Sequence, residues 1–117
     1  MARTETVTVV FTDLVGSTEL ANRLGHDGYE ALRHAHFGAL RTAAAAHNGV
    51  EIKTTGDGLM LSFTSAADGI ACAVAMQQAT DGRKSHEPVH IRVGISSGEA
   101  THESGDVFGV SGVTTRT

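Results

Sequence analysis

Apolar and polar residues alternate near both ends of the chain, a spacing typical of β-strands. Near the N-terminus, Val7, Val9 and Phe11 alternate with polar or outward positions, which predicts a strand over residues 6–10. Towards the C-terminus, an apolar residue occupies every second position over residues 89–95. This second alternation is the cleanest in the chain and predicts another strand.

Residues 51–63 show a different pattern, with two apolar runs on either side of Gly56, Asp57 and Gly58. An Asp-Gly pair between two apolar runs is a strong signal for a β-hairpin. The sequence therefore predicts two strands joined by a tight turn, with Asp57 at its tip.

Helical spacing of apolar residues fills the segment between the first strand and the hairpin. Residues 14–24 predict a short helix, residues 25–28 interrupt it, and residues 29–47 predict a longer helix. One stripe of the longer helix consists of Tyr29, Leu32, His36, Leu40, Ala43 and Ala44. Asn48 and Gly49 end this helix, and Gly49 is expected to take the left-handed conformation.

A third helix follows the hairpin. Ser65 begins a sequence that resembles a capping box, and the helix is expected to continue to about Ala79. Its expected packing face consists of Ile70, Ala73, Val74 and Gln77. The polar residues 81–87 predict a loop, and residues 99–106 are polar and turn-like.

The predicted order is therefore β-α-α-β-β-α-β. This order describes an α+β fold, a ferredoxin-like sandwich in which helices cover one face of an antiparallel sheet.

Composition and charge narrow the function. A chain of 117 residues has room for one small domain, and its formal net charge of −4 argues against a nucleic-acid partner. The single cysteine, Cys72, excludes an internal disulfide and suits a reducing compartment. No run reaches the ~20 apolar residues of a membrane span, and no signal peptide opens the chain. The expectation is a cytoplasmic protein without a membrane partner.

An acid stands at the end of the first predicted strand, just before a glycine-containing turn that opens a helix. The backbone N–H groups of such a turn, together with the positive end of the helix dipole, suit a phosphate group. Asp13 beside the turn could hold a divalent cation. The structural alternative is that Asp13 only ends a strand and that Ser17 or Thr18 caps the helix.

Asp57 supplies a second carboxylate. Two carboxylates brought together can bridge two divalent metal ions, which then hold a polyphosphate for in-line displacement. The alternative for Asp57 alone is that it is only a turn residue.

Three motifs in this order carry a family resemblance. Residues 11–18 read FTDLVGST, residues 52–58 read IKTTGDG, and residues 91–98 read IRVGISSG. Together they resemble the catalytic domain of class III nucleotidyl cyclases, and most nearly the bacterial adenylyl cyclases of the mycobacterial type. The resemblance covers residues 6–109 and implies the same ferredoxin-like core. It indicates that residues 1–117 form a single cyclase catalytic domain that is C-terminally truncated.

The resemblance implies an enzyme that converts ATP to cyclic AMP and pyrophosphate by a two-metal mechanism. Asp13 and Asp57 would be the catalytic carboxylates that bind two Mg²⁺ or Mn²⁺ ions, with the carbonyl of Leu14 as a further ligand. The implied phosphate-binding residues are Val15, Gly16, Ser17 and Thr18, through their amides, and Arg92. The structural alternative for Arg92 is a solvated or ion-paired residue on a strand.

The resemblance also implies how the base is recognised and how the chain assembles. Lys53 and Asp106 match the family's purine-binding pair, and a lysine donor with a carboxylate acceptor suits adenine. The structural alternatives are that Lys53 is a solvated lysine on a strand and that Asp106 is an acidic turn residue. A homodimer with shared active sites is implied, because the family's metal and purine residues for one site come from different chains.

The last residues depart from the family pattern. Val113 stands where the family has an asparagine, and Thr117 where it has an arginine, and both family residues stabilise the transition state. These 117 residues are therefore expected to be weak or inactive as a cyclase. The alternative function is a catalytically inactive nucleotide- or metal-binding or regulatory module of the same fold. A ferredoxin-like domain with no nucleotide ligand would require all three motif matches to be chance.

Overall fold

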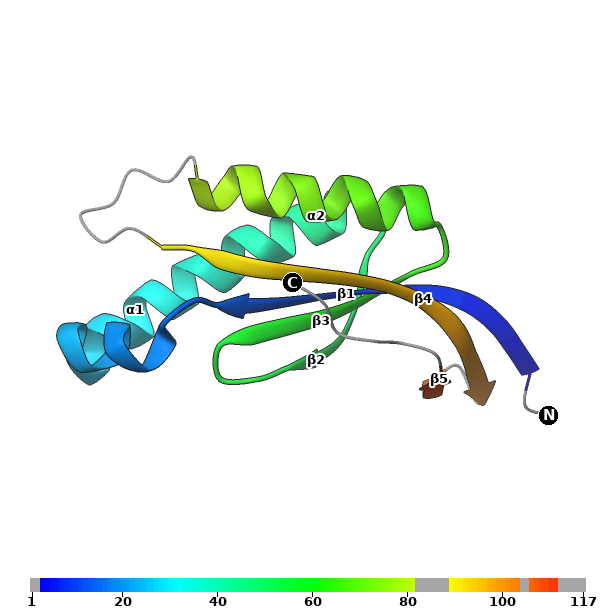
Figure 1. The fold of residues 1–117 in the computed structure, drawn as a ribbon, viewed down its shortest axis with the longest axis horizontal. Coiled ribbons are helices and arrows are strands. Elements are labelled where there is room, and N and C mark those ends of the chain that lie inside the picture. Colours follow the sequence, from blue (N-terminus) through cyan, green and yellow to red (C-terminus); the bar gives the residue numbers. More distant parts are fainter. Residues whose placement is uncertain (1–2, 82–88, 104–105, 112–117) are drawn as a thin grey trace.

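The computed structural model describes residues 3–81, 89–103 and 106–111. The strands are β1 (Arg3–Leu14), β2 (Val50–Thr54), β3 (Gly58–Phe63), β4 (Ile91–Glu103) and β5 (Asp106–Ser111), and the helices are α1 (Ser17–Ala46) and α2 (Ala66–Asp81). The strands form one antiparallel sheet in the order β2-β3-β1-β4-β5. Both helices cover the same face of this sheet (Figure 1). The first four strands with the two helices confirm the predicted ferredoxin-like sandwich.

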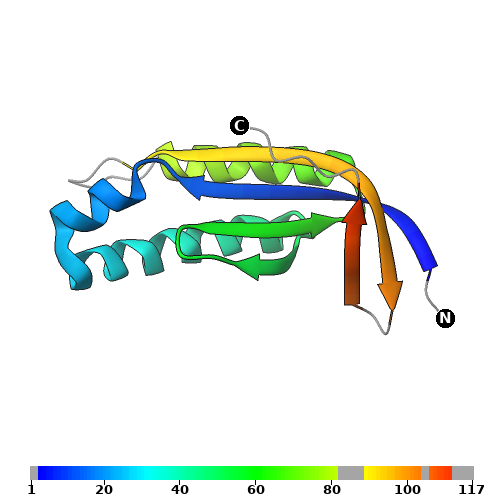
Figure 2. The same ribbon diagram turned by 60° about the horizontal axis from the view of Figure 1, so that its bottom comes forward.

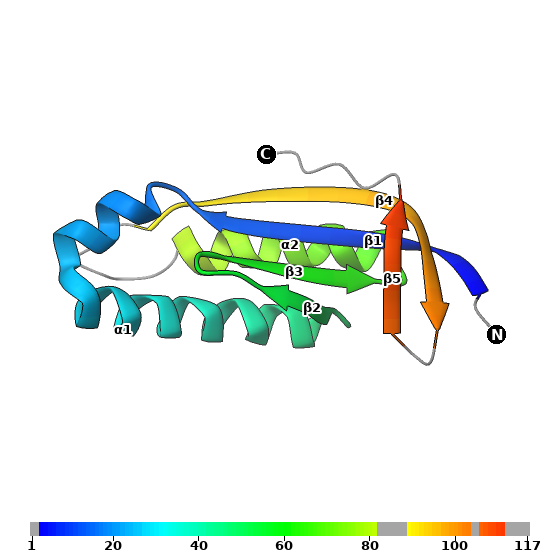
Figure 3. The same ribbon diagram turned by 90° about the horizontal axis from the view of Figure 1, so that it is seen from below.

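Strand β1 lies in the middle of the sheet, and it carries buried side chains on both of its faces. Val10 and Leu14 point into the main core beneath the helices, where they join residues such as Leu40 and Met76. Val7 and Val9 belong to a smaller cluster with Phe11 and Met60. Figure 3 views the sheet from the side opposite the helices. The chemistry at the end of β1 is therefore carried by a strand that is fixed by packing on both sides.

The first helix differs from its prediction in where it begins. Residues 11–14 continue β1, so that Leu14 ends the strand and α1 begins at Ser17. The two helices expected before the hairpin form one bent element, because Gly25 has non-helical dihedral angles (φ 76°, ψ 173°). At the other end of α1, the left-handed residue is Asn48 (φ 62°) and not Gly49.

Helix α2 begins as expected, but it packs with a different face. The Ser65 hydroxyl oxygen accepts a hydrogen bond from the Asp68 amide at 3.2 Å. Half of the expected packing face is wrong, because Ile70 and Val74 are 56% and 50% exposed. Ala73 packs against the core as expected, and Gln77 donates to the Ile91 carbonyl oxygen at 3.4 Å. The buried positions of α2 are Gly69, Cys72, Met76 and Thr80. The small Gly69 and Cys72 let α2 lie close to the sheet, and the larger Ile70 and Val74 face outward.

The expectation that residues 99–106 are turn-like is wrong for residues 99–103 and for Asp106, which lie in strands. Strand β4 continues to Glu103 and pairs with the first half of β1, and β5 then pairs back on it (Figure 2). Pairing of its backbone with β1 holds this strand although its side chains are polar. The sequence therefore showed no apolar alternation here. Residues 82–87 of the expected loop, and also Val113 and Thr117, lie outside the described residues. In the described part of the chain, neither helix has the length and apolar character needed to cross a membrane.

Candidate active site

The hairpin tip and the end of β1 bring the two predicted carboxylates together. Asp13 lies directly opposite Gly58 in the β1–β3 ladder, and the Leu14 amide donates to the Asp57 carbonyl oxygen at 3.1 Å. A Cβ atom at position 58 would lie 2.3 Å from the carbonyl oxygen of Thr12. Only glycine therefore allows the tip to approach β1 this closely. The Gly56-Asp57-Gly58 sequence thus forms the turn and also places Asp57 beside Asp13.

The Asp57 carboxylate affects the ionisation of Asp13. The pKa of Asp13 is raised from its ordinary value of 3.8, first by desolvation, then by the hydrogen bond and negative charge of Asp57. Arg92 opposes this rise. Two adjoining carboxylates hinder each other's ionisation, and a divalent cation between them relieves that repulsion.

The turn after β1 leaves backbone donors at the start of α1. Gly16 is the N-cap residue in the left-handed conformation (φ 65°), and no side chain caps the helix. The Leu20 amide donates to the Gly16 carbonyl at 3.0 Å, so the amides of the three preceding helical residues lie before the first intrahelical bond. The Val15 amide already donates to the His90 carbonyl at 2.9 Å. The amides suited to an anion are therefore those that follow Val15.

Ser17 does not cap the helix, because its hydroxyl points elsewhere. The Ser17 Oγ donates to the Asp57 Oδ2 at 3.0 Å, which ties the start of α1 to the hairpin tip. Arg92 lies opposite Asp13 in the β1–β4 ladder, and its Nη1 is 3.9 Å from the Asp13 Oδ2. A cleft of about 500 Å³ is lined by Asp13, Leu14, Val15, Gly16, Ser17, Thr18, Glu19, Asp57 and Arg92. The structure thus gathers every residue predicted to bind metal or phosphate.

The predicted purine residues lie elsewhere. Lys53 is exposed on β2 and lines a separate pocket of about 220 Å³ whose other walls include Phe11 and Met60. This pocket shares no lining residue with the cleft around Asp13 and Asp57. Asp106 begins β5, but its side chain is outside the described part of the structure. Within one chain, the structure therefore does not bring Lys53 to the two carboxylates.

The donor set at the cleft fits a magnesium-type ion. Magnesium is commonly held by one or two carboxylates while water and substrate phosphates complete its coordination. Asp13 and Asp57 supply two carboxylates, and the Leu14 carbonyl is an oxygen of the same strand end. Among the described residues, no group of three or more His, Cys, Asp or Glu side chains could enclose a metal ion. The site therefore offers a cation two carboxylates and a carbonyl oxygen, and it leaves the rest of the coordination to water or phosphate.

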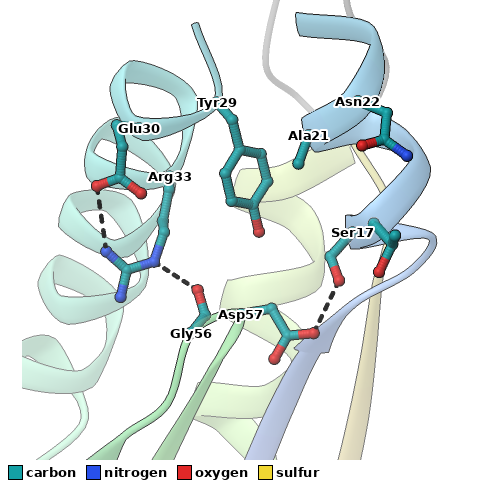
Figure 4. Close-up of a pocket in the computed structure, with 9 residues that line it drawn as sticks. Ser17, Ala21, Asn22, Tyr29, Glu30, Arg33, Gly56 and Asp57 are labelled. Carbon is teal, nitrogen blue, oxygen red and sulfur yellow. Dashed lines mark hydrogen bonds and ion pairs between the residues drawn. The ribbon is translucent and has the colours of Figure 1, made fainter. Parts of the chain in front are cut away.

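Sequence reasoning missed two residues of α1 that face the hairpin tip, Tyr29 and Arg33 (Figure 4). Arg33 Nε and Nη2 donate to the carbonyl oxygens of Gly56 and Thr55 at 2.5 Å and 3.2 Å. The pKa of the Tyr29 hydroxyl is raised, first by desolvation and then by the charge of Asp57. Their spacing of four residues on one helical stripe was the available signal. Only the folded structure shows that the hairpin tip lies opposite these two residues.

With this geometry, comparison with known proteins identifies the class. Residues 1–110 match the family described as "Adenylate and Guanylate cyclase catalytic domain". Because the match covers nearly the whole chain, the chain belongs to this family of nucleotidyl cyclase domains.

Individual relatives are similar over most of this chain. The adenylate cyclase of Streptomyces coelicolor is 32% identical over 103 residues, which are 88% of this chain and 26% of that protein. An uncharacterized protein of Mycobacterium bovis is 33% identical over 98 residues, 82% of this chain and 32% of its own length. The chain spans between 14% and 32% of the length of the curated relatives it matches.

A solved structure shows the same fold. The catalytic core of a rhodopsin-guanylyl cyclase with converted specificity, in complex with ATPαS, superposes with a TM-score of 0.82 at 21% sequence identity. The superposition covers 93% of this chain and 68% of that one.

Proposed function

We propose that this domain is an adenylyl cyclase of the bacterial, mycobacterial type, which converts ATP to cyclic AMP and pyrophosphate. The observation that carries the proposal is the meeting of Asp13 and Asp57 beside the amides that open α1. A phosphate-binding turn, a pair of metal-binding carboxylates and a nearby arginine are the groups that phosphoryl transfer from a nucleoside triphosphate requires.

Each group has a distinct part in the proposed reaction. Asp13, Asp57 and the Leu14 carbonyl would hold two Mg²⁺ or Mn²⁺ ions, and these ions would acidify the ribose 3′-hydroxyl and neutralise triphosphate charge. The amides of Gly16, Ser17 and Thr18 hold the terminal phosphates, and Arg92 lies at the same cleft. The 3′-hydroxyl loses its proton to water and its oxygen forms a bond to the α-phosphorus. The bond from that phosphorus to the bridging oxygen breaks, and pyrophosphate leaves with that oxygen.

Recognition of the base is proposed to involve a second chain. Lys53 and Asp106 would read the adenine edge, and the pocket beside Lys53 is separate from the carboxylate cleft of its own chain. A two-fold homodimer would place the Lys53 pocket of one chain against the carboxylate cleft of the other. Each dimer would then contain two shared sites.

A second candidate is a catalytically inactive nucleotide- or metal-binding module. Val113 and Thr117 favour it, because the family resemblance leads us to expect an asparagine and an arginine at these two positions. Interactions made only in the transition state raise the rate, and loss of one preorganised donor commonly costs ~10²–10³ in rate. We therefore propose that residues 1–117 bind Mn-ATP and turn it over weakly or not at all.

The test separates binding from turnover. Calorimetry should detect Mn-ATP binding to the 117-residue chain and its loss in Asp13→Ala and Asp57→Ala, while circular dichroism shows that both variants fold. Cyclic AMP should then be measured at high enzyme concentration, beside a longer chain that carries the rest of the family domain. Unchanged binding in both variants would refute the metal role. Full turnover by the 117 residues would refute the proposed weakness.

A further inference from the structure

We propose that Arg33 is a positioning residue that holds the hairpin tip, and with it the Asp57 carboxylate, in the pose needed for metal binding. The proposal rests on the function proposed above and adds a residue that neither the motifs nor the cleft lining contain. Arg33 comes from the second half of α1, beyond the kink, and reaches across to the tip between β2 and β3 (Figure 4).

The contacts of Arg33 are directed at the backbone immediately before Asp57. Its guanidinium donates to the carbonyl oxygens of Thr55 and Gly56, two successive residues of the turn. A planar guanidinium that engages two acceptors fixes orientation as well as distance. Because these carbonyls precede Asp57 along the chain, they fix the peptide from which its side chain projects.

Arg33 is itself held in place. Its guanidinium carbon lies 4.8 Å from the centroid of the buried Phe37 ring, and its Nη1 is 3.8 Å from a Glu30 carboxylate oxygen. Its side chain is 27% exposed, compared with 49% for Arg41, two turns further along α1. A cation over an aromatic face gains attraction as it is desolvated. The half-buried Arg33 side chain is therefore held in one position.

Hydrogen bonds between Thr55 and Gly58 close the turn itself, and contacts from other elements reach Asp57. Ser17 holds the Asp57 carboxylate itself, and the Leu14 amide holds the Asp57 carbonyl. Leu14 ends β1 and Ser17 begins α1, so both contacts come from the junction of these two elements. Arg33 acts from the part of α1 beyond the kink at Gly25, so the tip is held from two places. Groups that orient a metal ligand without touching the ion typically change metal affinity or activity by ~10–100-fold when they are removed.

The chain offers a matched control in Arg41. It lies on the same helix, and its guanidinium carbon is 5.6 Å from the centroid of the same Phe37 ring. Its hydrogen bonds go to the side chains of Glu51 and Thr54, not to the carbonyls of the tip. Arg33→Met and Arg41→Met each remove one positive charge and one cation–aromatic contact with Phe37. Only Arg33→Met also removes the hydrogen bonds to the carbonyl oxygens that precede Asp57.

The experiment measures Mn²⁺ alone by paramagnetic resonance, together with amide hydrogen exchange in the absence of metal. Arg33→Met should weaken Mn²⁺ binding by ~10-fold or more and speed exchange of the Leu14 and Thr55 amides. Arg41→Met should change neither. Arg33→Lys, which keeps the charge but can reach fewer carbonyls, should fall between them and serves as the variant to read if Arg33→Met does not fold.

Asp57→Asn separates the two proposals. If it abolishes Mn²⁺ binding while Arg33→Met behaves like Arg41→Met in both measurements, the positioning role is refuted and the metal role of Asp57 stands. If Asp57→Asn binds Mn²⁺ like the unaltered chain, the proposed metal site fails. The exchange of Leu14 and Thr55 then decides by itself whether Arg33 holds the tip.

Discussion

At the scale of single residues, the site is built from groups that disfavour the metal-free fold. Asp13 and Asp57 adjoin, and the pKa of Asp13 rises because desolvation and the neighbouring carboxylate oppose its ionisation. Arg92 offsets only part of this, at 3.9 Å from Asp13. The pair is therefore a cost to the fold that a bound cation would remove.

This cost predicts a pH-dependent effect of Asp13→Asn. A raised folded-state pKa means that the folded chain binds the proton more tightly, so the stabilisation is present at low pH and is lost as pH rises through that pKa. In EDTA at pH 7, Asp13→Asn should be more stable than the unaltered chain, and the difference should vanish below the ordinary pKa of 3.8.

The magnitude of this effect is limited by solvent, because the Asp13 side chain is 46% exposed. Screening keeps such interactions to ~0.2–1 kcal/mol. Urea denaturation between pH 3 and 7 measures the difference in stability, and Asp27→Asn at an exposed position of α1 is the control. A loss of stability at pH 7 in Asp13→Asn would contradict the prediction.

A second residue-scale prediction concerns the base. Lys53→Glu together with Asp106→Cys should reduce the preference for ATP over GTP, because a donor and an acceptor towards the purine edge are exchanged. Competition between Mn-ATP and Mn-GTP for binding measures this preference. An unchanged ratio would show that this pair does not read the base.

At the scale of elements, the close approach of α2 to the sheet depends on one position. A Cβ atom at Gly69 would lie 2.9 Å from Thr8 Cγ2 on β1, and the position is buried. The helix α1 contains a contrasting glycine, Gly38, whose added Cβ would meet nothing within 4 Å. The two positions separate packing from helix propensity.

Gly69→Ala should therefore destabilise the chain by ~1–3 kcal/mol, the usual effect of overpacking. Gly38→Ala should stabilise it by ~0.5–1 kcal/mol, because alanine is the better helix former and the site is open. Thermal and urea denaturation of the two variants test both signs. Equal shifts in the same direction would show that Gly69 is not under packing constraint.

At the scale of the whole molecule, the carboxylate cleft and the Lys53 pocket are separate on one chain, which leads to a complementation test. Asp13→Ala and Lys53→Ala chains should each bind Mn-ATP poorly. Mixed in equal amounts, they should recover about a quarter of the full-strength sites, since half of the dimers are mixed and each restores one site. Sedimentation should show a dimer. Monomer only, together with failed recovery, would contradict the shared site.

The sequence predicted the parts of this structure that local chemistry determines. The Asp-Gly turn, the glycine break at Gly25 and the core-facing stripe of α1 each follow from residues close together in the chain. The gathering of Asp13, Asp57 and Arg92 was expected through the family resemblance and is present in the cleft.

The failures were decided by distant parts of the chain. Ile70 and Val74 point outward because the small Gly69 and Cys72 fit closer to the sheet. The spacing of apolar residues does not predict how closely a helix approaches a sheet. The polar end of β4 is a strand because β1 pairs with it. Arg33 was missed because its partners are backbone carbonyls 22 and 23 residues away, which leave no trace in side-chain patterns.

The register of β2 has a consequence for how the protein behaves in concentrated solution. This strand forms one end of the sheet, and exposed edges invite other chains to add strands and aggregate. The pairing of β2 with β3 shifts between Glu51 and Lys53, so Ile52 is an extra residue that bends the edge. Exposed charges at Glu51 and Lys53 flank the bulge. The same lysine that is proposed to read a base thus also helps to keep this edge from growing into a larger assembly.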